Sequence, residues 1–228
     1  MSVPHVASVF YKGAYKCGAS VLTSTSALTA AHCDYRKTGD AASTLKVRAG
    51  MQSTSSMINV QERATTTIRK HPSYSAASMK NDIMILKWSN QLTLNNYVKP
   101  VNLPSLRITR SSSSTASSFT TCAYGYDSNN RDTKELTCFT GSTKSHSTCN
   151  SSTGWNGLVY SPYQFCIEGN SKSAGACFHD GGAPAINNNV IYGIYSFPDL
   201  QFNGSTYPRS AKCNESGKPG VFTQEKGS

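Results

Sequence analysis

The stretch Thr-Ala-Ala-His-Cys at residues 29–33 follows a segment of β character and places His32 directly beside a cysteine. A second informative stretch, Asn-Asp-Ile-Met-Ile-Leu-Lys at 81–87, places Asp82 at the start of an apolar run as long as a buried strand. A third, Cys-Phe-His-Asp-Gly-Gly-Ala-Pro at 177–184, is a glycine-rich turn after a cysteine. Each stretch alone is weak evidence, and their order along one chain is what gives them meaning.

Around these stretches, short apolar or alternating segments recur between turn residues, a pattern typical of an all-β sandwich or barrel. The expected strands are 5–11, 17–22, 45–49, 60–68, 83–88, 120–126, 136–140, 165–167 and 190–196, with one short helical turn within 146–156. The hydroxyl-rich segment 110–118 buries nothing, so we expect a linker at about 109–118. It would separate two β subdomains, about 1–108 and 119–228.

Length and charge narrow the function classes. The 228 residues suffice for one large or two small domains. No apolar run approaches the ~18 residues of a membrane-spanning helix, and the start lacks a signal-peptide core. The net charge is +10, but the basic residues are scattered along the sequence. We therefore expect a solvated basic surface and no nucleic-acid or membrane partner, and keep binding of a polyanion such as a glycosaminoglycan as an alternative.

The eight cysteines favour an oxidising compartment. They are even in number, widely spaced and without a CxxC pair, which argues for four disulfides rather than a zinc ribbon or a redox motif. Three glycosylation sequons, at Asn150, Asn203 and Asn214, agree with a secreted protein.

The order of histidine, aspartate and glycine-rich turn resembles the trypsin/chymotrypsin-like serine proteases. Smaller matches lie at 71–74, 102–104, 193–194 and 218–223, so the resemblance covers nearly the whole chain. It implies an all-β fold of two six-stranded antiparallel β-barrels with a cleft between them.

The resemblance assigns His32 as the general base and Asp82 as the acid that orients it. The family's nucleophile turn reads Gly-Asp-Ser-Gly-Gly-Pro, and here Gly181 stands at the serine position. Residues 178–195 contain no Ser, Thr or Cys that would replace it. Since glycine has no side chain, we expect no proteolytic activity.

Other parts of the family's site are also altered. His179 replaces the glycine that supplies one oxyanion-hole amide, and its β-carbon is expected to disfavour the required backbone conformation. At the base of the specificity pocket, Gly175 replaces the acid of trypsin-like members. The pocket wall Ser-Trp-Gly becomes Ser196, Phe197 and Pro198, and proline cannot donate a backbone hydrogen bond to a substrate.

The resemblance also makes predictions about Asp180 and the cysteines. In the family, the acid matching Asp180 pairs with a newly cut N-terminus, and this chain lacks that N-terminal sequence. We therefore expect Asp180 to be exposed, protonated, or paired with His179 or a lysine. The implied bridges are Cys17–Cys33, Cys149–Cys166 and Cys177–Cys213, and two cysteines without their usual partners, Cys122 and Cys138, are expected to bond each other.

Within the family, the chain resembles the mite inactivated serine protease paralogues related to the group 3 allergens. This implies a secreted, monomeric binding protein that inhibits host complement by binding its components, without cofactor or metal. The alternatives are the polyanion binder and an active hydrolase with non-standard chemistry. A metal site of His32, His179 and an aspartate is a further alternative, because imidazole suits zinc.

Overall fold

The structure, a computed structural model, describes residues 3–105, 117–126, 131–132, 134–151, 159, 163–171, 175–177, 179–197 and 219–224. The first half contains β1 (Val6–Tyr11), β2 (Ala14–Thr23), β3 (Ser26–Thr29), η1 (Ala31–Cys33), η2 (Ala42–Thr44), β4 (Leu45–Ala49), β5 (Gln61–Ala64), β6 (Thr67–Lys70) and β7 (Met84–Lys87). The second half contains β8 (Ser118–Ala123), β9 (Thr137–Thr143), α1 (His146–Cys149), β10 (Gln164–Gly169), β11 (Pro184–Asn187), β12 (Val190–Phe197) and β13 (Gly220–Gln224). Most of the expected linker at 109–118 lies outside the described residues.

The first sheet is antiparallel, with seven strands in the order β5-β4-β1-β2-β3-β7-β6. Its two end strands, β5 and β6, are consecutive in the sequence and only Thr65 and Thr66 separate them. The Thr65 N–H donates to the carbonyl of Leu45 in β4, the partner of β5, whereas the Thr66 N–H donates to the carbonyl of Lys87 in β7. The chain therefore changes partners between two neighbouring residues, and the sheet must curl to bring its ends together.

This bend corrects one sequence-based expectation. The segment 60–68 alternates like a single strand, but the structure divides it into β5 and β6, which pair with opposite ends of the sheet. The seven hydrogen-bonded strands thus correspond to the expected six, with one strand bent at Thr65. Local alternation predicts the extended backbone but carries no information about the partner of each residue.

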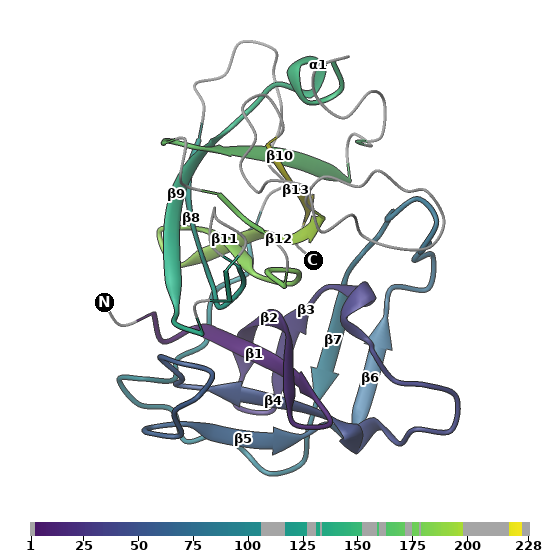
Figure 1. The fold of residues 1–228 in the computed structure, drawn as a ribbon, viewed down its shortest axis with the longest axis vertical. Helices are drawn as coiled ribbons and strands as arrows, with labels where there is room; N and C mark the ends of the chain where they lie inside the picture. The colour runs from purple at the N-terminus through teal and green to yellow at the C-terminus, as the bar shows by residue number, and fades with distance from the viewer. Residues whose placement is uncertain are drawn as a thin grey trace.

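The second sheet is a closed six-stranded barrel in the order β10-β13-β12-β11-β8-β9, and the pairing of β10 with β9 closes it. Figure 1 shows this barrel above the first sheet. The two sheets confirm the chymotrypsin-like arrangement of two β-barrels. Within the described residues, no helix is long and apolar enough to cross a membrane.

Two large apolar clusters fill the protein, and the first extends across the junction to Ile186, Ile191 and Ile194 of the second half. Small and branched side chains such as Val9, Val47 and Leu86 fill the first, whereas aromatic rings such as Phe165 and Phe222 fill the second. The halves meet closely where β2 contacts β11, because Gly18 leaves no room for a side chain: a β-carbon there would lie 3.0 Å from the Ala183 backbone. This contact brings the turn before β11 against the first sheet.

Disulfides join Cys17 to Cys33, Cys122 to Cys138, and Cys149 to Cys166. Cys122 and Cys138 lie directly opposite each other on β8 and β9, so the strand register brings together the two cysteines that the resemblance left without partners. Cys177 is also disulfide-bonded, and its expected partner Cys213 lies outside the described residues. These bridges fit a protein that folds in an oxidising compartment.

Candidate active site

His32 and Asp82 form a hydrogen-bonded pair at the junction of the two barrels. Asp82, fully buried just before β7, accepts the backbone N–H of His32 at 2.8 Å and lies 2.7 Å from its Nδ1. The Asp82 oxygen that lies near Nδ1, Oδ2, also accepts a hydrogen bond from the Ser196 hydroxyl at 2.5 Å. Because a carboxylate only accepts hydrogen bonds, Nδ1 of His32 carries a proton, which leaves Nε2 as the nitrogen that faces residue 181. Two of the three triad positions therefore keep the geometry of a general base and its orienting acid.

Gly181 lies where Nε2 of His32 would meet a nucleophile. A β-carbon built on Gly181 would lie 2.3 Å from His32 Nε2 and 3.4 Å from Cys17 Sγ. The sequence-based match of these positions therefore agrees with their placement in space. The first distance is much shorter than a van der Waals contact, so the imidazole occupies space that a side chain at residue 181 would need.

The turn that carries Gly181 is anchored on both sides. The carbonyl of Gly181 accepts the N–H of Gly18 at 2.8 Å, and the N–H of Gly182 donates to Tyr195 at 2.7 Å. Gly182 has a φ of 80°, and a β-carbon there would lie 2.2 Å from the Thr29 hydroxyl oxygen. Close packing against β2 and β3 therefore fixes the backbone of the turn that carries Gly181.

His179, at the expected oxyanion position, is held by two tyrosines. The Tyr15 hydroxyl donates to its carbonyl at 2.8 Å, and its ring stacks on Tyr126 with centroids 5.3 Å apart. Its φ of 68° lies in the left-handed region, which residues with a β-carbon rarely adopt. Although His179 is exposed overall, partial desolvation of its imidazole lowers the pKa of His179.

Asp180 is buried, so the first of its three alternatives, an exposed carboxyl, is wrong. One carboxyl oxygen accepts the N–H of Gly125 at 2.9 Å, and the other accepts the N–H of Cys177 at 2.7 Å. Among the described residues, the partners of this carboxyl are these two amides, not His179 or a lysine. Burial raises the pKa of Asp180 to about 7 although both amides lower it, in keeping with the protonated alternative.

The structure describes only part of the expected specificity pocket. Gly175 is half-buried, and the Ser196 hydroxyl is committed to Asp82. The backbone of Phe197 pairs with Val221, while its side chain and Pro198 lie outside the described residues. The roles of Tyr15 and Tyr126 have no local signal, because Tyr15 reaches His179 across 164 residues.

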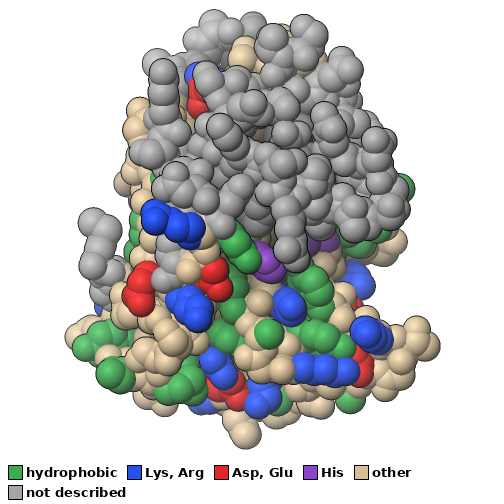
Figure 2. Space-filling view, viewed as in Figure 1, with side chains coloured by type: hydrophobic (Ala, Val, Ile, Leu, Met, Phe, Trp, Pro, Cys, Tyr) green, Lys and Arg blue, Asp and Glu red, His purple; other side chains and the backbone are tan. Residues whose placement is uncertain are grey.

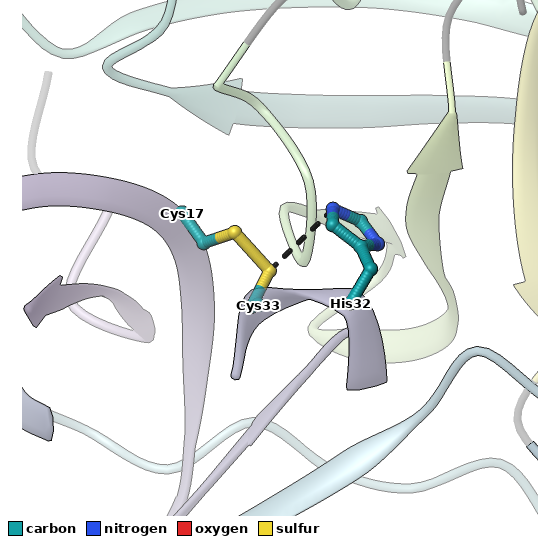
Figure 3. A group of neighbouring side chains, drawn as sticks. All are labelled: Cys17, His32 and Cys33. Carbon is teal, nitrogen blue, oxygen red and sulfur yellow. Dashed lines mark hydrogen bonds between the residues drawn. A yellow bond between two sulfur atoms is a disulfide. The ribbon is translucent and has the colours of Figure 1, made fainter. Parts of the chain in front are cut away.

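Cys17, His32 and Cys33 are the only group of three possible metal-ligand side chains that lie together in the described part of the chain (Figure 3). His32 Nε2 is 3.7 Å from Cys33 Sγ, but the two sulfurs form a disulfide. Since thiolates are the sulfur ligands of metals, this oxidised pair is not a metal site.

Asn150, one of the three sequon positions, has its side chain bound to Val159. Oδ1 accepts the Val159 N–H at 2.9 Å, and Nδ2 donates to the Val159 carbonyl at 2.7 Å. Nδ2 also lies 3.1 Å from Nε2 of His146. A glycan would replace one hydrogen of Nδ2 and so remove one of these contacts. The other two sequons, at Asn203 and Asn214, lie outside the described residues.

Comparison with known proteins agrees with this architecture. The family model described as Trypsin matches residues 1–226. Trypsin-2 of Salmo salar is 30% identical over 98% of this chain and 85% of its own length. Cationic trypsin-3 of Rattus norvegicus is 30% identical over 98% and 80%, respectively. A solved structure of neuropsin, a serine protease of mouse brain, superposes with a TM-score of 0.79 at 25% identity over 97% of this chain and 89% of its own. The chain therefore belongs to the trypsin family.

Proposed function

We propose that this chain is a catalytically inactive member of the trypsin family that is secreted and acts by binding. The observation that carries the proposal is Gly181, which offers no atom to attack a substrate at the position facing His32 Nε2. The relatives are named as trypsins, and the proposal is that this chain differs from them in activity because of Gly181. Serine protease chemistry begins with a nucleophilic oxygen that gives its proton to the histidine. A substitute nucleophile would therefore have to lie within reach of His32.

The hydroxyls and sulfurs beside His32 have other partners. The Ser196 hydroxyl donates to Asp82, and the Thr29 hydroxyl donates to the Gly18 carbonyl at 2.7 Å. The sulfurs of Cys17 and Cys33 are joined in a disulfide. These contacts favour inactivity over a hydrolase with a substitute nucleophile.

The partner in this proposal is a host protein, with complement components as the specific class. That choice is supported by the resemblance to the mite inactivated paralogues, and the disulfides support an extracellular setting. Binding would use the outer surface, because the altered positions Gly175 and Pro198 remove a charge partner and a backbone donor that a substrate-like peptide would need.

Complement-mediated lysis of sensitised erythrocytes tests this proposal. We expect the protein to lower lysis in serum in a dose-dependent way, and His32→Ala to lower it equally, because a binding mechanism does not use the imidazole. Serum albumin at the same concentrations, used as a control protein, should have no effect on lysis. Loss of inhibition in His32→Ala would argue for residual catalysis, whereas lysis unchanged by the unmutated protein would remove complement as the target.

A further inference from the structure

The positive charge of this protein is concentrated in its first half. Residues 1–105 contain 12 Lys or Arg and 4 Asp or Glu, a net charge of +8 out of the +10 of the whole chain. Figure 2 shows more Lys and Arg side chains than acidic ones on the lower part of the face that it presents. The fold determines where on the surface these cations gather.

Five of these cations lie on three neighbouring segments: the β1–β2 hairpin, the loop at 34–41 and the end of β6. We call Lys12, Lys16, Arg36, Lys37 and Lys70 the basic cluster. Two carboxylates organise it. Asp34 lies 2.9 Å from Arg36 Nε and 3.0 Å from Lys70 Nζ, and Asp40 lies 3.3 Å from Lys12 Nζ.

Lys16 and Lys37 complete the basic cluster. The Lys16 ammonium lies over the Tyr35 ring, 5.4 Å from its centroid, and the backbone N–H of Lys37 donates to Asp40 at 3.0 Å. Five cations around two carboxylates leave a local excess of three positive charges.

The carboxylates lie beneath the cations rather than among them. The side chain of Asp34 is 4% exposed and that of Asp40 is 18% exposed, whereas Lys12 is 55% exposed and Lys70 is 41% exposed. Although burial opposes it, hydrogen bonds from Arg36 and Lys70 lower the pKa of Asp34. The Tyr11 hydroxyl is the main cause that lowers the pKa of Asp40 to about 2. Both acids are thus ionised at neutral pH and position the cations, while the outward surface is positive.

We propose that the basic cluster binds a linear sulfated polysaccharide of the glycosaminoglycan class. Exposed lysines on three separate segments, at Lys12, Lys37 and Lys70, match a repeating anion better than a single ion. The polysaccharide can also follow the excess charge beyond the cluster, because the remainder of the first half is basic as well. The disulfides place the protein where such polysaccharides occur, outside the reducing cytosol.

An acidic peptide is the competing partner, and the composition of the surface argues against it. Protein interfaces depend on buried aromatic and aliphatic anchors. Of the large apolar side chains that are exposed among the described residues, only Tyr35 belongs to the cluster's segments. The others, at Met57, Ile58, Leu94, Tyr97, Leu103 and Tyr163, belong to other segments.

Isothermal titration with a heparin octasaccharide tests the proposal at two salt concentrations. We expect binding that weakens as salt rises, because ionic contacts are screened. Lys37→Gln with Lys70→Gln should weaken binding roughly tenfold, in line with two exposed ionic contacts. The matched control is Lys87→Gln with Lys99→Gln, which also removes two exposed lysines of the first half but leaves the cluster intact. The control should change affinity by less than about twofold, because Lys87 lies at the opposite end of β7 from the cluster.

Equal losses of heparin affinity in the two double variants would overturn the assignment of the basic cluster as the binding site and indicate binding by net charge alone. If the unmutated protein did not bind heparin, or bound polyglutamate of equal charge more tightly, the proposal of a sulfated polysaccharide as the ligand would be wrong. Thermal melting of both variants checks that they are folded. The inference is independent of the vestigial triad, so hydrolysis and complement assays can fail or succeed without deciding it.

Discussion

Purified protein incubated with casein or peptide esters is expected to hydrolyse neither of them measurably. The reaction needs a hydroxyl between His32 Nε2 and the substrate carbonyl, and Gly181 supplies none. In an unrelated serine protease, loss of the nucleophile alone lowers turnover by about a millionfold. A deficit of that order places any remaining rate below detection in an ordinary assay.

The assay needs two references, an active trypsin and the His32→Ala variant. Equal traces of activity in the protein and in His32→Ala would identify a contaminating protease. Activity that His32→Ala abolishes would contradict the prediction, because it would show that the imidazole takes part in catalysis without a serine at residue 181.

Restoring the nucleophile alone is expected to leave a poor enzyme. In Gly181→Ser the new β-carbon would lie 2.3 Å from His32 Nε2, so the imidazole must move while Asp82 holds its Nδ1 at 2.7 Å. His179 remains fixed by Tyr15 and Tyr126 at the position of an oxyanion donor, and one such donor is worth roughly 10²–10³ in rate. We expect Gly181→Ser to remain at least about a hundredfold slower than an active trypsin on esters.

Hydrolysis rates of three variants separate these defects. Gly181→Ala introduces the β-carbon without the hydroxyl, so its thermal stability reports the steric effect alone. Adding His179→Gly to Gly181→Ser should increase ester hydrolysis, while peptide hydrolysis stays slow because Gly175 and Pro198 are unchanged. A single Gly181→Ser variant within about tenfold of an active trypsin would show that the other changes are harmless.

Much of the fold was predictable because the deciding signals are local or spaced as in a known family. The β4 alternation is visible in the sequence, and the structure forms that strand at Leu45–Ala49 as expected. The strands β3, β11 and β13 were not predicted. They are only four or five residues long and buried through pairing with distant strands, so local periodicity is too short to identify them.

The candidate site was predictable where motifs carry it and hidden where tertiary contacts make it. The positions of His32, Asp82 and Gly181 follow from their motifs, and the structure brings all three together. The amide of Gly125 on Asp180, by contrast, lies 55 residues away in the sequence, and only the folded second half brings it to the carboxyl.

The basic cluster shows the same limit for surface charge. Lys12, Arg36 and Lys70 look scattered along the sequence, and they converge only because the curled first sheet places the β1–β2 turn, the following loop and β6 together. A count of charges predicts how much positive surface exists, whereas long-range contacts determine where it lies.

The most direct test of the central claim is covalent labelling with a fluorophosphonate, which reacts with the activated serine of a working serine protease. Intact-mass measurement should show one adduct on an active trypsin and none on this protein, because Gly181 offers no nucleophile at the position that faces His32. A stoichiometric adduct on the unmutated protein that disappears in His32→Ala would contradict the account, since it would reveal an activated nucleophile at a site that we describe as lacking one.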